Sequence, residues 1–290
     1  LKARETGTTV TGIKQSEFRK VLIPIPPLNE QKAIAHILST LDEKIEVNKQ
    51  INKKLEKIAQ TIFKHWFVDF EFPNEEGKPY KSSGGKMVES ELGMIPKGWE
   101  VKTLTEIAYM KNGVNYSREQ EGNEIRIINV RDFDGSLVVN EAKLDSISLP
   151  KKQISDYLLE QYDTLVVRSA KPGETLLVLN NKEVVYSGFT IRVRSIDRFL
   201  RLIVFYSIRN AMRMLNNSSG GTIFKNLNQQ LLGSLKVIVP KSNILEIYNS
   251  FIISHLEMIN EKNMEIDNLT SLRDTLLPKL MSGEIRVPLE

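Results

Sequence analysis

Two long stretches of heptad spacing constrain the fold of this chain more than any other feature. Between residues 29 and 64, and again between residues 242 and 281, mostly apolar side chains recur at alternating spacings of three and four residues. This spacing predicts long helices, each with one seam that a partner helix must cover. At a rise of about 1.5 Å per residue, the first segment would form a rod about 54 Å long.

Asparagine interrupts both predicted seams, at positions 48, 52 and 263. A buried asparagine in such a seam would fix register and partner at a cost in stability, whereas the alternative is a side chain that faces solvent. The sequence leaves both alternatives open. The positions expected to pair between the helices are Leu41, Ile45, Asn48, Asn52, Leu55, Leu256, Ile259, Asn263, Ile266 and Leu269.

The segment between the two heptad stretches has a different character. Residues 77–85 are rich in Gly, Pro, Ser and Lys and are typical of a linker, and from Leu92 to Pro240 short β-rich runs dominate. The sequence therefore predicts an α+β domain of about 150 residues. Its expected strands are 124–130, 163–167, 175–178, 184–185, 189–193 and 235–239, and its expected helices are 151–160 and 199–215.

An internal repeat precedes each heptad stretch. Gly7-Thr8 is followed by Ile13, Phe18 and Val21, and Gly221-Thr222 is followed at the same offsets by Leu227, Leu232 and Leu235. A proline then leads into each long helix, after a short apolar run at Val21–Pro24 in the first copy. The repeated unit is the end of a domain, a strand and a long helix, seen twice.

Five motifs in this order resemble those of one protein family, over nearly the whole chain. The family is that of the DNA specificity subunits of type I restriction–modification systems. The motifs are the Gly-Thr lead-in, Ile23-Pro-x-Pro-Pro-Leu-Asn-Glu-Gln31, Leu41-Asp-Glu-Lys-Ile45, Leu92-Gly-x-Ile-Pro-x-Gly-Trp99, and Leu272-Arg-Asp-Thr-Leu-Leu-Pro-Lys-Leu280 with Ser282-Gly283.

The resemblance implies an architecture. In that family, two target-recognition domains alternate with two conserved helices, which pack antiparallel, measure the distance between two DNA half-sites and dock modification subunits. By this pattern the fold is α+β, with one mixed target-recognition domain flanked by two long helices packed as an antiparallel coiled coil. The implied parts are the end of a first recognition domain (1–28), the central helix (29–72), a linker (73–91), a second recognition domain (92–240) and the distal helix (241–290).

The resemblance also implies partners. These are double-stranded DNA, modification (methyltransferase) subunits and, through them, restriction subunits. We expect no cofactor on this chain, whereas the partner subunits in the family use S-adenosylmethionine, ATP and Mg. Because most of a first recognition domain is lacking, a homodimer that pairs through the helices would restore two reading domains.

Three loops carry the residue types that contact DNA. Arginine, asparagine and glutamine form bidentate hydrogen bonds with base edges, and glycine lets the backbone approach a phosphate closely. The loops are residues 111–118, 168–173 and 216–222. The candidate DNA-binding residues are Lys111, Asn112, Asn115, Tyr116, Arg118, Arg168, Ser169, Lys171, Arg213, Asn216, Ser218, Gly221 and Thr222.

A basic stretch between Arg192 and Lys236 supports the same hypothesis, since it holds eight basic residues and one acid, Asp197. Basic side chains on one face would neutralise phosphates. The alternative is that these arginines only form a solvated helix or strand face. The third loop has an alternative too, as a simple flexible connection, and Tyr116 is as well suited to a core as to base stacking.

Signals of an enzyme are weak. His36, His65 and His255 are far apart on helical sequence, the acidic pair Asp42-Glu43 lies on a heptad helix, and no phosphate-binding or dinucleotide-binding glycine motif is present. We therefore expect no catalytic residue and no metal site. Cysteine is absent, which excludes disulfides, and no apolar run approaches a membrane span. A cytoplasmic protein without membrane contact is expected.

Two functions from different classes follow. The first is a sequence-specific DNA-binding subunit that reads a half-site and docks modification subunits on its helices. The second is a truncated assembly or decoy module that binds modification subunits, or a second copy of itself, without productive DNA reading. The two differ at the loops, because a domain that no longer reads DNA would not need clustered arginine and asparagine.

Overall fold

The structure is a computed structural model, and it describes residues 15–21, 25–117, 119–139, 144–179, 183–218 and 226–287, without the side chains of 216–218. The chain divides into two compact units. One consists of residues 1–48 and 265–290, and the other of residues 49–264. Most of the apolar run expected at Val21–Pro24 lies outside the described residues.

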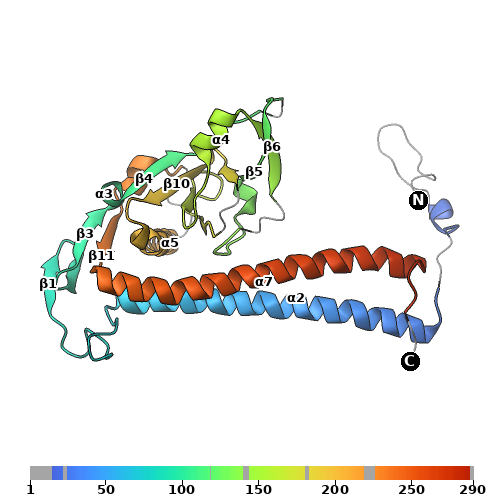
Figure 1. Ribbon diagram of the computed structural model, residues 1–290, viewed down its shortest axis with the longest axis horizontal. Coiled ribbons are helices and arrows are strands. Elements are labelled where there is room, and N and C mark those ends of the chain that lie inside the picture. The colour runs from blue at the N-terminus through green and yellow to red at the C-terminus, as the bar shows by residue number, and fades with distance from the viewer. Residues whose placement is uncertain are drawn as a thin grey trace. The chain divides into compact units, whose positions relative to one another are not determined.

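Two long helices confirm the heptad segments (Figure 1). They are α2 (Leu28–Phe63) and α7 (Ser242–Ser282), which begin and end within a residue of the bounds that the periodicity predicts. The helices pair antiparallel in each unit. Asp42 pairs with Arg273 and Glu30 with Arg286 in the smaller unit, and Asn52 pairs with Asn263 in the larger. A short helix, α1 (Gln15–Phe18), precedes α2.

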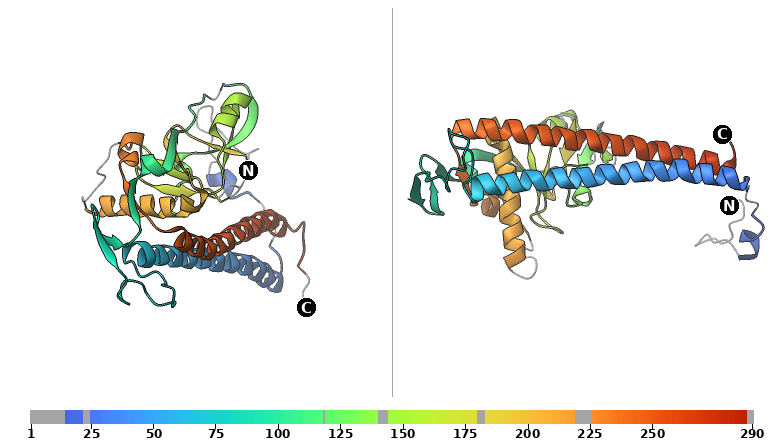
Figure 2. Two further views of the ribbon diagram at one scale, coloured as in Figure 1. Left: turned by 60° about the vertical axis from the view of Figure 1, so that its left-hand side comes forward. Right: turned by 90° about the horizontal axis from the view of Figure 1, so that it is seen from below.

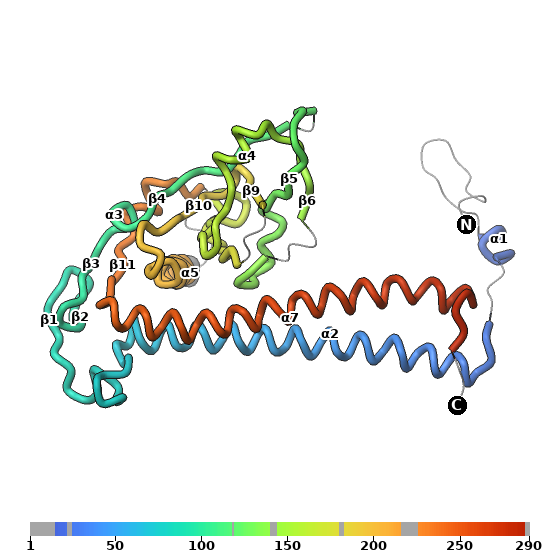
Figure 3. The backbone as a smooth tube through the Cα atoms, in the orientation of Figure 1, coloured from blue at the N-terminus to red at the C-terminus, as the bar shows by residue number. Residues whose placement is uncertain are grey.

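The larger unit holds the α+β domain between the ends of these helices. After α2 come the π-helix η2 (Lys64–Val68) and the hairpin of β1 (Met87–Ser90) and β2 (Gly93–Pro96), as the backbone trace in Figure 3 follows. The strand β3 (Glu100–Thr103) then pairs with β11 (Lys236–Val239), which brings the entry and exit of the domain together. The domain therefore begins and ends beside the long helices.

Two further sheets form the body of the domain. One has the antiparallel order β4 (Ala108–Asn112), β10 (Thr190–Ser195), β7 (Thr164–Val167) and β8 (Thr175–Leu177). The other has the order β6 (Asp145–Leu149), β5 (Asn123–Ile128) and β9 (Val184–Tyr186), in which β5 and β9 are parallel. The connecting helices are α3 (Leu104–Ile107), η3 (Val130–Asp132), α4 (Lys151–Tyr157), η5 (Arg198–Leu200), α5 (Arg201–Ser218) and α6 (Gln229–Gly233).

One hydrophobic core joins the domain to the helices. Helix α5 is buried along Leu202–Tyr206 and contacts β7, β8 and β10, and Figure 2 shows it running crosswise to the end of α2. The Phe63 ring of α2 stacks on the Tyr206 ring of α5 at 5.4 Å between centroids. Trp99 stacks on Phe72 at 4.8 Å, so Trp99 is a core residue. The α+β domain and this end of the helix pair thus share one hydrophobic core.

The predicted strands and helices of this domain are largely confirmed, with bounds that differ by up to three residues. The prediction missed β1, β2, β3, β4 and β6 and the short helices α3 and α6. The segment 73–91, expected as a linker, contains β1 and includes Tyr80, whose ring stacks on Phe72. Within the described residues, no helix is long and apolar enough to cross a membrane.

Candidate nucleic-acid interface

Three loops meet at one edge of the four-stranded sheet. Strand β4 ends at Asn112, opposite Ile191 of β10, and β7 ends at Val167, opposite Thr190. Because the strands are antiparallel, the segments that follow β4 and β7 and the turn that precedes β10 lie side by side. We call residues 113–116, 168–170 and 187–189 the reading edge.

Backbone hydrogen bonds hold the reading edge in one conformation. The Gly188 N–H donates to the Val114 carbonyl at 2.8 Å, and the Arg168 N–H donates to the Phe189 carbonyl at 2.9 Å. A side chain at Gly113 would place its Cβ 2.2 Å from the Ser187 carbonyl oxygen, so only glycine fits there. The Leu227 N–H donates to the Arg168 carbonyl at 2.8 Å, which ties the returning chain to the same edge.

Besides the small Ala170, three side chains of the reading edge face solvent. Phe189 is 64% exposed, and Asn115 and Tyr116 are exposed beside it. The Tyr116 hydroxyl donates to Asn129 Oδ1 at 3.4 Å, so its ring lies over the surface and not in the core. The sequence predicts Phe189 as the first residue of a strand. The Ser187-Gly188 pair in front of it was the turn signal that could have placed it in a loop.

The other candidates of the first two loops form bonds within the chain. The Lys111 ammonium donates to the Asp156 carbonyl at 2.8 Å and lies 4.3 Å from the centroid of the Tyr157 ring. The side-chain amides of Asn112 and Gln229 are hydrogen-bonded at 2.9 Å. Arg168 donates from Nη1 to the Gly188 carbonyl at 3.3 Å. The side chains of these three residues are therefore hydrogen-bonded to other parts of the domain.

The remaining candidates lie apart from these or are not described. Ser169 is half-buried on the reading edge, and Lys171 donates to the Phe133 carbonyl at 2.9 Å. Arg213 donates to Gln60 Oε1 at 2.7 Å. Asn216 and Ser218 lie in the last turn of α5, with side chains that are not described, and Arg118, Gly221 and Thr222 lie outside the described residues.

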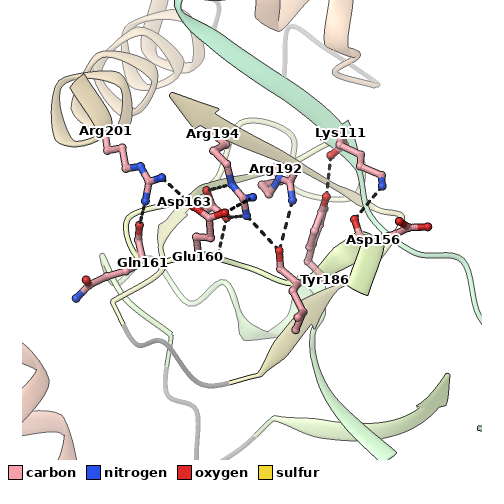
Figure 4. A network of polar contacts seen from close by, with 10 residues as sticks. Lys111, Asp156, Glu160, Gln161, Asp163, Tyr186, Arg192, Arg194 and Arg201 are labelled. Carbon is pink, nitrogen blue, oxygen red and sulfur yellow. Dashed lines mark hydrogen bonds and ion pairs between the residues drawn. The ribbon is translucent and has the colours of Figure 1, made fainter. Parts of the chain in front are cut away.

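Most described members of the basic stretch form hydrogen bonds or ion pairs within the domain, as Figure 4 shows for Arg192, Arg194 and Arg201. The sequence predicts instead that these side chains form a phosphate-binding face. Arg194 donates two hydrogen bonds to the fully buried Asp163 carboxylate, from Nε at 2.8 Å and from Nη2 at 2.6 Å. Glu160 bridges Arg194 and Arg201, at 2.6 and 2.8 Å. Arg192 caps the Leu158 carbonyl at 3.4 Å. Asp163 and Glu160, which lie outside the basic stretch, neutralise Arg194 and Arg201, so part of the positive charge of the stretch is compensated within the domain.

This network stabilises the charged form of Arg194. Burial acts to lower the pKa of Arg194, but the hydrogen bonds and charge of Asp163, together with the charge of Glu160, outweigh it and raise that pKa. The pair is bidentate and shielded from water, which makes it a structural link between β10 and the segment before β7.

A second polar link fastens the domain to α2. Arg209 of α5 is buried and donates to the carbonyls of Thr175 and Gly135, at 3.0 and 2.8 Å. Burial and the nearby Arg213 lower the pKa of Arg209 to about 10. Glu56 of α2 accepts from the Leu137 N–H at 2.9 Å, and burial raises the pKa of that carboxyl.

Comparison with known proteins settles the family. Residues 1–57 and 96–268 match the sequence profile of the type I restriction modification DNA specificity domain. This chain belongs to that family. Each matched segment of the specificity-domain profile ends inside one of the two long helices, in agreement with the repeated unit seen in the sequence.

The relatives of this specificity-family chain are themselves specificity subunits. The chain is 30% identical, over 99% of its length, to the MjaIX type I restriction enzyme specificity subunit of Methanocaldococcus jannaschii and covers 66% of it. It is 24% identical, over 98% of its length, to the HindI specificity subunit of Haemophilus influenzae and covers 73% of it. Both relatives are specificity subunits by name, and the chain spans about two thirds of their length.

A solved relative confirms the fold class. The crystal structure of the type I restriction–modification S subunit from M. genitalium superposes with a TM-score of 0.57 at 18% identity, over 96% of this chain and 68% of that one. The α+β architecture with paired long helices is therefore the fold of this family member.

The helix seam of this specificity-family chain contains a polar layer. The Asn52 amide donates to Asn263 Oδ1 at 2.7 Å. Asn48 is 0% exposed, and neither its Oδ1 nor its Nδ2 has a hydrogen-bond partner. Ile45, Leu55, Leu256 and Ile259 are buried, whereas Leu41, Asn263, Ile266 and Leu269 are half-buried.

Proposed function

We propose that this chain gives sequence specificity to a type I restriction–modification complex by reading one DNA half-site with residues 92–240. The observation that carries the proposal is the reading edge, where three loops are fixed by backbone hydrogen bonds and present Phe189, Asn115 and Tyr116 to solvent. Its helices act as spacer and docking site. The partner subunits supply the S-adenosylmethionine, ATP and Mg chemistry.

The side chains of the reading edge suit base edges. An asparagine amide can pair with the adenine N6 and N7 positions in the major groove, and an apolar ring can contact the thymine methyl group. Because the backbone of Gly113 and Gly188 is already fixed, little conformational entropy is lost when these groups bind. Lys171, which is exposed near Phe133, would add a phosphate contact that positions the domain without reading sequence.

An apolar stripe on α7 supports the docking role. Ile247, Phe251 and Met258 are each between 45% and 48% exposed, and their spacings of four and seven residues place them on one face of the helix. Exposed apolar side chains in a row are typical of a surface that another protein covers. We assign this stripe to the modification subunits.

The test of DNA reading uses the chain assembled with its modification subunits. Mapping of methylated sites in a genome first identifies the cognate duplex. Phe189→Ala is then compared with Phe199→Ala, which removes another exposed ring at the opposite end of β10. Loss of one base contact costs about 1 to 3 kcal/mol, so Phe189→Ala should weaken cognate binding about 5- to 150-fold. Binding to a random duplex should not change.

Equal cognate affinities for the two variants would contradict this role of Phe189. The alternative function is a helical assembly or decoy module, which the internal engagement of Lys111 and Asn112 favours. It predicts a complex that assembles with modification subunits but prefers no duplex. Pairing of two copies through the helices is tested by sedimentation equilibrium, and a monomer at all concentrations would argue against it.

A further inference from the structure

A cleft of about 260 Å³ lies between α2 and α5 in the larger unit. Long helix α2 contributes Lys57 and Gln60, η2 contributes Lys64, and α5 contributes Arg209 and Arg213. The other lining residues are Thr61, Phe63, Tyr206 and Asn210. Four cationic side chains therefore surround one hollow.

The positive charge of this cleft is largely uncompensated. Among the described residues, neither Lys57 nor Arg213 forms an ion pair, whereas Lys64 pairs with Asp69 at 2.8 Å. The Glu56 carboxylate accepts a hydrogen bond from the Leu137 N–H, and its charge acts on Arg209 and Arg213. Glu56 is itself partly buried in a site that disfavours its charge. The open side of the cleft therefore attracts anions.

Two buried polar atoms of the wall also have no hydrogen-bond partner within the described part of the chain. The Tyr206 hydroxyl and the Arg209 Nε are both buried without a hydrogen bond, although their side chains are almost fully enclosed. Most buried polar groups in proteins are satisfied, so such atoms deserve an explanation. An anion in the adjacent cleft would improve the electrostatic environment of both donors.

The cleft shares Arg209 and Arg213 with a second hollow, which one candidate DNA-binding loop also lines. Arg213 also lines a smaller hollow of about 130 Å³ on its other side, together with Phe133 and Gly173. Gly173 ends the 168–173 loop, and Lys171 of that loop donates to the Phe133 carbonyl. Arg213 thus lies between the α2–α5 cleft and a loop predicted to meet DNA.

We infer that the α2–α5 cleft is a phosphate-binding site, and that its ligand is a phosphodiester group of the DNA backbone. The planar guanidinium of Arg213, positioned by Gln60, matches two phosphate oxygens, and Lys57 adds a point charge. The long helix then contacts DNA directly as well as spacing the recognition domains. This inference rests on the proposed function, since it needs DNA beside the recognition domain.

The test measures how the affinity of the full chain for a random-sequence duplex depends on salt. The double variant Lys57→Gln with Arg213→Gln is compared with Lys54→Gln with Arg198→Gln. The control removes the same charge from the same two regions at exposed residues that do not line the cleft. Loss of one phosphate contact lowers the slope of log affinity against log salt by about 0.9.

Between 50 and 200 mM salt, wild type and control should each lose about 3.5-fold more affinity than the cleft variant. Inorganic phosphate is the probe for a free anion as the ligand. It should raise the melting temperature of wild type and control, but not that of the cleft variant. Equal salt slopes in the two double variants would overturn the inference, even if the phosphate effect differed. If wild type assembled with its modification subunits binds neither the random nor the cognate duplex, the proposed function is refuted instead.

Discussion

The Arg194–Asp163 pair offers a sharp test of whether the basic stretch is structural. Replacing Arg194 with Met keeps much of the side-chain volume but leaves the Asp163 carboxylate, which is 0% exposed, without its bidentate partner. Removing one partner of a buried ion pair costs about 3 to 5 kcal/mol. Because the Arg194 side chain is 21% exposed, we expect the lower end, about 3 kcal/mol.

The assay is urea unfolding of the full chain at pH 7, followed by circular dichroism. With a slope of about 2 to 3 kcal/mol per molar urea, a loss of about 3 kcal/mol lowers the midpoint by about 1 to 1.5 M. Arg131 pairs with Asp145 on the surface, where both side chains are largely exposed, so Arg131→Met should shift the midpoint far less.

The double variant Asp163→Leu with Arg194→Met completes the test. It removes both charges together, so it should be more stable than Arg194→Met alone. The reasoning would be refuted if Arg194→Met shifted the midpoint no more than Arg131→Met. If Arg194→Met had normal stability but a lower slope of log DNA affinity against log salt, Arg194 would instead belong to the DNA-binding face.

Two further stability predictions follow from buried polar groups. Asn48→Leu should raise the free energy of unfolding by about 1 to 3 kcal/mol, because it removes two buried polar atoms without partners, and a lower unfolding midpoint would contradict this. Glu56→Gln should stabilise the chain at pH 7, because burial raises the pKa of Glu56 above its ordinary 4.5 and its ionised form is disfavoured in the folded state. The folded-state stability linked to Glu56 is present below pH 4.5 and is lost as pH rises through the raised pKa, so the advantage of Gln over Glu should shrink as pH falls towards 4. An advantage that grew on acidification would contradict that assignment.

Several short strands escaped the sequence analysis for a physical reason. Strands β1, β3 and β6 are four or five residues long and carry few fully buried side chains, so they lack a clear alternation of apolar and polar residues. They are strands because distant partners complete them, as Lys236–Val239 completes β3. The pattern of apolar and polar residues within each short segment could not reveal these distant partners.

The pairing of the basic residues shows the same limit of local sequence patterns. In the sequence, the stretch from Arg192 to Lys236 holds one acid, but Asp163 and Glu160 reach it from before β7 and Glu91 reaches Lys236 from before β2. The net charge of a sequence segment therefore does not give the net charge of the surface that the segment forms. Arg213, which keeps no ion pair among the described residues and lines the α2–α5 cleft, is a member of the stretch for which the DNA-binding hypothesis remains.

The sequence by itself determined the two long helices, their bounds and the seam residues, because heptad periodicity is a local property of the chain. It also determined the family, through motifs that the profile match confirmed. Only the tertiary structure decided which loop residues face solvent. The reading edge depends on the pairing of β4, β10 and β7, in which paired residues lie up to 87 positions apart. That pairing exposes Phe189, whereas Lys111 and Asn112 form hydrogen bonds with other parts of the domain.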